Sequence, residues 1–239
     1  MNLNIKNYRV LQVLPHLNSG GLVSGAIEIS GALQKSGSSS FVASQGGRRE
    51  REITREGGKL FLLPLASKNP FIIFLNIFRL SKIIKKNKIS IIHARSRAPA
   101  WSAYYAAKKM GIPFVTTFHG TYSINNKIKK KYNSVMAKGD KVIAISNFIR
   151  KHILNNYGIL NERIVTIHRG IKVDYFNHLK VSSERLITFS KKFNIPEENF
   201  VVLLPGRITR WKGHKDLQEC KANLQRAAGR QGPRELWGN

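Results

Sequence analysis

The chain has 239 residues, 42% of them hydrophobic, so it can bury a sizeable core and is not a disordered chain. Lys and Arg outnumber Asp and Glu by 41 to 13, which gives a formal net charge of +28. This charge predicts attraction to polyanions such as nucleic acid, an anionic membrane surface or phosphorylated substrates, without choosing among them. The single cysteine, Cys220, excludes a disulfide within the chain and suits a reducing compartment.

Short apolar runs alternate with helical stretches as far as His168. Strands are predicted at 10–15, 40–44, 59–65, 89–93, 113–118, 141–145 and 164–168. Helices are predicted at 24–35, 71–86, 99–110 and 147–156. Because these strands lack polar alternation and are separated by helices, we expect a parallel sheet that is covered on both faces. The predicted fold class is α/β, a doubly wound, Rossmann-like domain over residues 1–181.

A second unit is predicted to begin near Ser182. A helix at 183–193, a buried strand at 200–205 and a helix start near Gly213 repeat the strand–helix alternation of the first unit. We therefore expect residues 182–217 to be the start of a truncated second Rossmann-like domain. The tail 218–239 contains no isoleucine and is rich in Arg, Gln and Gly, so it is either a frame-shifted end or an ordinary divergent helix.

No segment is predicted to span a membrane or to direct secretion. The N-terminus lacks the basic-then-apolar pattern of a signal peptide. The apolar stretch 60–80 is split at 68–70, and the run 71–78 is shorter than the roughly 20 residues that a spanning helix needs. We expect a soluble, cytoplasmic chain. Its basic, apolar segment 71–88 either rests on an anionic membrane face or is an ordinary covering helix.

Candidate site residues stand where predicted strands end. Gly20 and Gly21 follow the first strand, where backbone can approach a ligand and a helix N-terminus can hold a phosphate; a plain tight turn is the simpler alternative. His93 and His119 end two successive strands, and Arg95 lies just beyond the first. Ligands of open α/β sheets bind outside the carboxyl ends of the strands, so a polar site is expected there, although either histidine alone could be structural.

The segment LPGRITRWKGHKDL offers a second candidate site. Arg207 and Lys212 lie between a predicted strand and a predicted helix. Arginine can bind two phosphate oxygens and lysine adds a point charge, which suits a diphosphate clamp; an exposed basic turn is the alternative. No His or Cys cluster has metal-ligand spacing, so neither a metal nor a cofactor is expected. Ser146 lacks a nucleophile-elbow context and is predicted to cap the helix that follows.

Taken in order, these segments resemble the glycosyltransferase group 4 family. The matching pieces are SGG after the first strand, TFHG, AIS, IHRGIKVDYF and GRITRWKG, within residues 8–217. The resemblance implies the GT-B fold, in which two Rossmann-like domains face each other and the N-terminal one receives the acceptor. It also implies transfer of a sugar from a nucleotide-sugar donor to a surface glycan or a lipid-linked acceptor, with retained configuration and without a metal ion.

The resemblance further implies roles for individual residues. Gly20 and Gly21 would lie against the donor diphosphate. Arg207 and Lys212 would neutralise that diphosphate as it leaves, where negative charge develops. His119 would face the sugar near the reacting carbon.

The remaining residues are assigned to the cleft. His93, Arg95 and Ser146 would belong to the acceptor side or support the cleft, and Gly170 and Asp174 would mark the passage to the second domain. The family usually has Asn-Gly where this chain has Arg169-Gly170, a variation that we expect to be tolerated.

A second departure from the family concerns the donor site. The family's Glu-x7-Glu element would lie several tens of residues beyond Lys212, so the donor site is expected to be largely missing. A catalytically dead remnant is therefore one alternative function. A basic nucleic-acid-binding module is another, although no known nucleic-acid-binding motif is found.

Overall fold

The computed structural model describes residues 7–171, 173, 175–196, 201–206, 208 and 210–227. The chain divides into two compact units, unit 1 at residues 1–170 and unit 2 at residues 171–239. The domain limits at residues 181 and 217 stay predictions.

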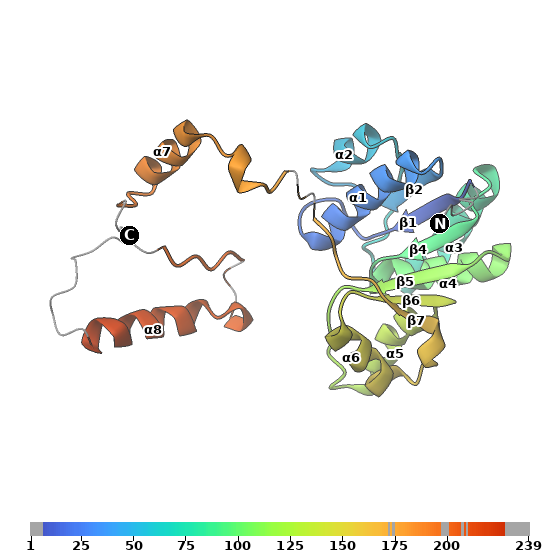
Figure 1. The fold of residues 1–239 in the computed structure, drawn as a ribbon. Helices are drawn as coiled ribbons and strands as arrows, with labels where there is room; N and C mark the ends of the chain where they lie inside the picture. The colour runs from blue at the N-terminus through green and yellow to red at the C-terminus, as the bar shows by residue number, and fades with distance from the viewer. Residues whose placement is uncertain are drawn as a thin grey trace. The chain divides into compact units, whose positions relative to one another are not determined.

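Unit 1 is built around a seven-stranded sheet in which all neighbouring strands are parallel (Figure 1). The strand order is β3-β2-β1-β4-β5-β6-β7. The strands are β1 Arg9–Val13, β2 Ser39–Ser44, β3 Lys59–Leu62, β4 Ile91–Ala94, β5 Phe114–Phe118, β6 Lys141–Ala144 and β7 Ile164–Thr166. The predicted doubly wound α/β fold is confirmed, and each predicted strand of unit 1 is present with slightly shifted ends.

Helices connect these strands. They are α1 Gly21–Lys35, α2 Glu50–Arg55, α3 Pro70–Lys86, α4 Arg97–Met110, α5 Lys127–Asn133 and α6 Asn147–Tyr157, with 3-10 turns η1 Ser134–Lys138 and η2 Asn161–Arg163. The four predicted helices correspond to α1, α3, α4 and α6. The helix α4 ends at Gly111 and α6 ends at Gly158, and both glycines have a left-handed backbone.

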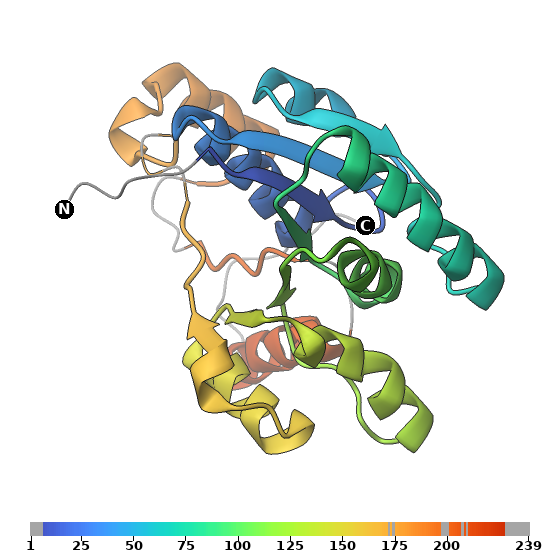
Figure 2. The same cartoon turned by 90° about the vertical axis from the view of Figure 1, so that its right-hand side faces the viewer.

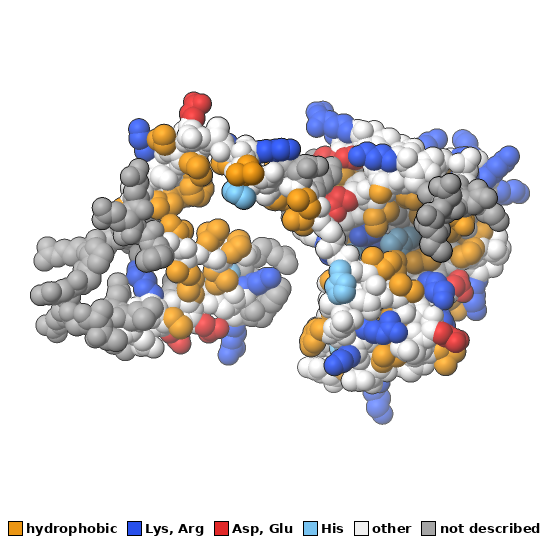
Figure 3. All heavy atoms as spheres, in the orientation of Figure 1, with side chains coloured by type: hydrophobic (Ala, Val, Ile, Leu, Met, Phe, Trp, Pro, Cys, Tyr) orange, Lys and Arg blue, Asp and Glu red, His pale blue; other side chains and the backbone are white. Residues whose placement is uncertain are grey.

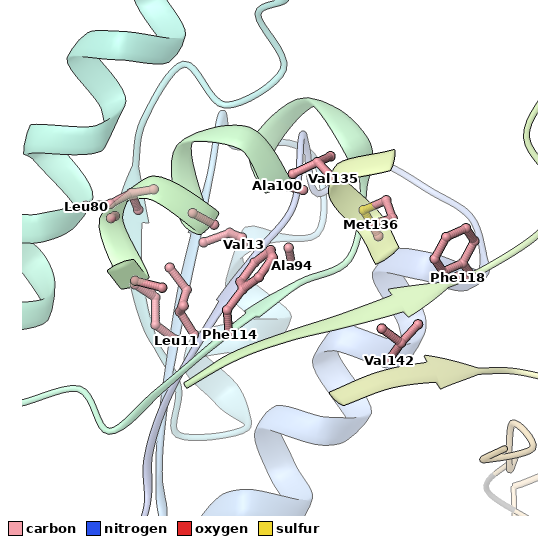
Figure 4. Close-up of a cluster of buried hydrophobic side chains, with 14 of the residues drawn as sticks. Leu11, Val13, Leu80, Ala94, Ala100, Phe114, Phe118, Val135, Met136 and Val142 are labelled. Carbon is pink, nitrogen blue, oxygen red and sulfur yellow. The ribbon is translucent and has the colours of Figure 1, made fainter. Parts of the chain in front are cut away.

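Two apolar layers cover the two faces of the sheet. The larger cluster packs α3, α4, α6 and η1 against one face, with Leu80, Phe118 and Met136 fully buried (Figure 4). The smaller cluster packs α1 and α2 against the other face around Leu14 and Leu17. Figure 2 shows α3 and α4 together on one side of the strands. Since side chains alternate along a strand, the two faces of β1, β4 and β5 carry different residues.

Residues on the α1 face of the central strands are partly polar. Gln12 of β1 is in register with His93 of β4, and neither is in the apolar clusters. Gln12 is completely buried, and its side-chain nitrogen donates to the carbonyl oxygen of Ala26 at 3.0 Å and to Ser30 Oγ at 3.3 Å. Gln12 and His93 each stand one residue before the end of their strand, so they lie close to the carboxyl edge of the sheet.

The described part of unit 2 is helical and irregular. It contains η3 His178–Lys180, α7 Ser183–Lys192, η4 Arg210–Lys212 and α8 His214–Ala227. The strand predicted at 200–205 is not formed at 201–205, and residue 200 lies outside the described residues. A strand needs a partner for its backbone hydrogen bonds, and the described residues of unit 2 supply none. Instead the apolar side chains of Val201, Val202 and Leu203 are exposed. Hydrophobic side chains are visible on the surface of unit 2 (Figure 3).

The predicted tail begins inside α8. Residues 218–227 continue this helix, and residues 228–239 lie outside the described part of the chain. No helix among the described residues is long and apolar enough to cross a membrane. Lys and Arg side chains are spread over the visible surface of unit 1, where acidic ones are few (Figure 3).

Candidate functional site

Three predicted site residues of unit 1, His93, Arg95 and His119, meet at the carboxyl edge of the sheet. Arg95 directly follows β4, His119 directly follows β5, and Arg169 lies shortly after β7. Because the strands are parallel, these positions share one edge. They surround a cavity of about 220 Å³, here called the edge pocket. Its lining residues are Gly25, Glu28, Ile29, His93, Arg95, Thr117, His119, Ile143, Ile145, Ile167, His168, Arg169 and Gly170.

The N-terminus of α1 opens beside this pocket. Gly20 precedes the helix with a φ of 102°, a backbone conformation that suits glycine, and Gly21 is the first helical residue. The first turn has no acidic residue and no side-chain cap. A Cβ built on Gly21 would clash with the guanidinium of Arg169, whose Cζ would be 3.3 Å away. Gly21 therefore makes room for Arg169, which lies against the helix where the diphosphate was expected.

Arg95 is buried and only partly satisfied. It is 3% exposed, and its Nη1 donates to Gln12 Oε1 at 3.1 Å, while its Nε is buried without a hydrogen-bond partner. Burial lowers the pKa of Arg95 to about 10, with a further lowering from Arg169, and Glu28 opposes this shift. Arg95 is still cationic at neutral pH, so the pocket contains a fixed positive charge.

His119 has unsatisfied ring nitrogens. Both Nδ1 and Nε2 are buried and have no hydrogen-bond partner. Burial, and then the positive charges of Arg95 and Arg169, lower the pKa of His119 to about 3. The imidazole is therefore neutral at neutral pH and offers one N–H donor and one acceptor nitrogen. Since buried polar atoms are normally paired, these nitrogens are suited to a polar ligand in the pocket.

His93 differs from His119 because it has a protein partner. Its Nε2 lies 2.7 Å from Thr117 Oγ1, and its side chain is 6% exposed. Burial, Arg95 and His119 together hold the pKa of His93 well below its usual value. His93 thus contributes a neutral, hydrogen-bonded wall to the pocket.

The other predicted residues lie elsewhere or outside the described chain. Ser146 caps α6, where its Oγ accepts from the backbone N–H of Ile149 at 3.2 Å, and it is not among the residues that line the edge pocket. Lys212 belongs to η4 of unit 2. Arg207 and Asp174 lie outside the described residues, so the diphosphate clamp of unit 2 stays a prediction.

The sequence interpretation missed several pocket residues. Arg169 was regarded as a tolerated replacement, and Glu28 and Thr117 were not singled out. Gln12, which holds Arg95 from outside the pocket lining, was not singled out either. The position of Arg169 shortly after a predicted strand was an available signal, because that position belongs to the carboxyl edge. Nothing local in the sequence marks Glu28, which is one of several polar residues on α1.

A larger cavity of about 570 Å³ lies near Gly111 and Gly158, which follow α4 and α6. These glycines stand before β5 and β7, so this cavity belongs to the amino edge of the sheet. Its acidic group, Asp140, accepts from the backbone N–H of Phe114 at 2.8 Å and is thereby satisfied. Because open α/β sheets bind ligands at the carboxyl edge, we assign the site to the smaller edge pocket. In the described part of the chain, no group of three or more His, Cys, Asp or Glu side chains could hold a metal ion.

The fold and the edge pocket define a doubly wound α/β protein with a polar, cationic site at the carboxyl edge of its parallel sheet. The family model of Glycosyltransferase Family 4 matches residues 19–175, which include every residue of that pocket. The chain belongs to this family. No curated protein matched the chain at the sequence level.

Solved structures agree with this assignment. A glycosyltransferase from Rickettsia africae is 43% identical, with a TM-score of 0.81 over 92% of this chain and 58% of that chain. HepE from Anabaena, solved in complex with UDP and glucose, is 15% identical, with a TM-score of 0.73 over 90% of this chain and 58% of that chain. The latter likeness shows the fold alone. The chain thus spans somewhat more than half the length of these proteins.

Proposed function

We propose that this chain provides the acceptor-side unit of a glycosyltransferase that transfers a sugar from a nucleotide-sugar donor to a glycan or lipid-linked acceptor. The observation that carries the proposal is the neutral, unpartnered His119 beside the cationic Arg95 at the carboxyl edge. A neutral imidazole can form hydrogen bonds with sugar hydroxyls. Because it carries no charge, it does not attract the negatively charged leaving group away from the cationic side chains. Retention of configuration and action at the cytoplasmic membrane face are further parts of this proposal.

The donor class is supported by a protein of the same fold. HepE was solved in complex with UDP-glucose, so uridine diphosphate sugars are the first donors to test. In our proposal the diphosphate lies at Gly20 and Gly21, where the free backbone N–H groups of a helix N-terminus favour anions. Arg207 and Lys212 would neutralise the charge that develops on the leaving diphosphate, without a metal ion.

The chemistry assigned to His119 is positioning of the transferred sugar. Its N–H donates to one hydroxyl, or its lone pair accepts from one. Burial, and then the positive charges of Arg95 and Arg169, keep the ring unprotonated. Burial in the pocket also limits the water that could take the place of the acceptor.

Incubation of the purified chain with UDP-glucose tests the proposal. Formation of UDP, by transfer or by slow hydrolysis, is expected to fall at least about tenfold in His119→Asn, in line with the loss of a positioned polar contact. His152→Asn on α6 is the matched control and should leave the rate unchanged. No UDP formation from any of several nucleotide sugars would favour the alternative of a catalytically dead remnant.

Family membership does not favour the alternative of a basic nucleic-acid-binding module. A gel shift at physiological salt provides the check. Binding that disappears as salt rises reports only the net charge of the chain, whereas tight and sequence-dependent binding would support the module.

A further inference from the structure

Arg95 and Arg169 place two guanidinium groups over the same residue of α1. A Cβ built on Gly25 would lie 2.7 Å from Nη2 of Arg95 and 3.1 Å from Nη2 of Arg169. The two groups come from loops after β4 and β7, so the sheet brings together residues that are far apart in sequence. One small ligand group above Gly25 could contact both.

The positive charges of this pair are not compensated by an ion pair. Neither Arg95 nor Arg169 has a salt bridge within the part of the chain that the structure describes. Glu28 lines the same pocket and attracts Arg95, but it forms no salt bridge with it. Two arginines beside one carboxylate leave a net positive charge, which an anion would offset.

Two further observations point to a ligand. The Nε of Arg95 is buried without a partner, in a side chain that is only 3% exposed. Arg95 lies against Gly25 of α1, a helix that begins with Gly21 and has no acidic residue in its first turn. Unpaired N–H groups at a helix start and a buried guanidinium donor favour the same kind of ligand, an oxyanion.

We propose that Arg95 and Arg169 together bind a phosphoryl group of a substrate at the N-terminus of α1. This inference deepens the proposed function, on which it rests for the class of substrate. The proposal assigns a binding role to Arg169, at a position where the family usually has Asn. The pair Arg95 and Arg169 is here called the clamp. Gln12 accepts a hydrogen bond from Nη1 of Arg95, so Nε and Nη2 of Arg95 are left for the ligand, and Arg169 supplies the second guanidinium group. The phosphoryl group belongs either to the donor diphosphate or to a phosphorylated acceptor.

Isothermal titration calorimetry on the full chain tests the clamp, with UDP, inorganic pyrophosphate, glucose 6-phosphate and uridine as probes. Arg169→Gln is expected to weaken the binding of phosphoryl probes by about tenfold or more, as for hydrogen bonds to a charged group. Arg55→Gln, an equal charge change at the exposed end of α2, is the matched control and should change affinity less than twofold. Uridine binding should be the same in all variants.

The pattern of losses identifies the source of the phosphoryl group. A loss confined to UDP and pyrophosphate assigns the clamp to the donor, and a loss confined to glucose 6-phosphate assigns it to a phosphorylated acceptor. A loss for every phosphoryl probe supports the clamp as a general phosphoryl site. Absence of phosphoryl binding in the unaltered chain, or equal losses in Arg169→Gln and Arg55→Gln, would overturn the proposal.

Gly25→Ala is a second test variant. It separates a binding role of the two arginines from a purely structural one, because it should weaken phosphoryl binding without lowering stability. The added methyl group displaces both guanidinium groups, while alanine favours the helix by up to about 1 kcal/mol over glycine. Phosphoryl binding should fall about tenfold with an unchanged or higher melting temperature, and unchanged binding would contradict the clamp. These readouts measure binding alone, so an inactive chain that still binds pyrophosphate through Arg169 would refute the proposed function and support the clamp.

Discussion

The ring nitrogen Nε2 of His93 lies 2.7 Å from the hydroxyl oxygen of Thr117 on the neighbouring strand. This bond joins β4 to β5 in the wall of the edge pocket, which both residues line, and occupies one nitrogen of a buried ring. His93 was expected to belong to the acceptor side or the cleft. It lines the pocket beside Arg95 and His119, but its hydrogen bond to Thr117 makes it part of the pocket wall.

Thr117→Val should destabilise unit 1 by about 1–3 kcal/mol, because it leaves His93 Nε2 buried and unpaired while the side-chain shape is kept. Urea unfolding followed by circular dichroism measures this loss. Thr117→Ser keeps the hydroxyl and should recover most of the stability. Equal losses in both variants would show that packing, not the hydrogen bond, is responsible.

The buried histidines make the stability of the chain depend on pH. His119 has a folded-state pKa of about 3, and that of His93 is also well below its usual value of 6.5. In the unfolded chain both rings take up protons as the pH falls through 6.5, whereas the folded chain does not. Stability is therefore complete above pH 6.5 and decreases below it, until for His119 the folded ring protonates near pH 3.

His119→Asn should reduce this pH dependence. Between pH 6 and pH 4.5, each histidine that stays neutral contributes a slope of about 1.4 kcal/mol per pH unit to the free energy of unfolding. Chemical unfolding at several pH values should give a slope that is smaller by this amount in the variant. A variant with lower stability at every pH but the same slope would contradict the assigned pKa shift.

Two glycines with positive φ should differ in their tolerance of alanine. Gly111 has a φ of 64° and no heavy atom within 4 Å of a built Cβ, so Gly111→Ala should cost only about 1–2 kcal/mol from the left-handed backbone. At Gly47, with a φ of 150°, a Cβ would lie 2.5 Å from the backbone carbon of Leu17. Gly47→Ala must displace backbone and should cost clearly more. Similar urea midpoints for the two variants would contradict this.

The exposed face of α3 gives a test of membrane association. Phe71, Phe74 and Phe78 are 66%, 54% and 46% exposed, and Lys82 and Lys85 continue the same face. Phe74→Ser should reduce co-sedimentation with phosphatidylglycerol vesicles, since an aromatic group beside basic residues favours an anionic interface. Phe148→Ser, at an exposed position of α6, is the matched control. No binding of the unaltered chain at low salt would exclude association through α3.

The central strands were predictable from the sequence because they are largely buried on both faces. Runs such as those at 89–93 and 113–118 are apolar without alternation, which only a covered parallel sheet explains. The short helices α2 and α5 were missed. Each is seven residues or fewer, and their sequences EREITR and KIKKKYN show no apolar period. The helix α5 is capped by the Asn126 side chain, which accepts from the N–H of Ile128. The helix α2 has no side-chain cap and buries only Ile53.

The candidate site was only partly predictable. His119, Arg95 and Gly21 could be found because they follow strands, and the strand order of a parallel sheet brings strand ends together. The pairing of Arg169 with Gly21 and Gly25 could not be found, because it depends on where a long side chain lies in space. The predicted strand at 200–205 had the right composition, but composition does not supply a neighbouring strand.

The central place of β1 has a consequence for synthesis of the chain. The backbone N–H of Arg9 donates to Ser90, which lies 81 residues further on, and β1 pairs on that side with β4. A ribosome therefore releases the first strand long before its second neighbour exists. Until β4 emerges, one edge of β1 is open to other chains, so the yield of folded protein should depend on how fast the ribosome translates residues 14–94 and on chaperones that cover this edge.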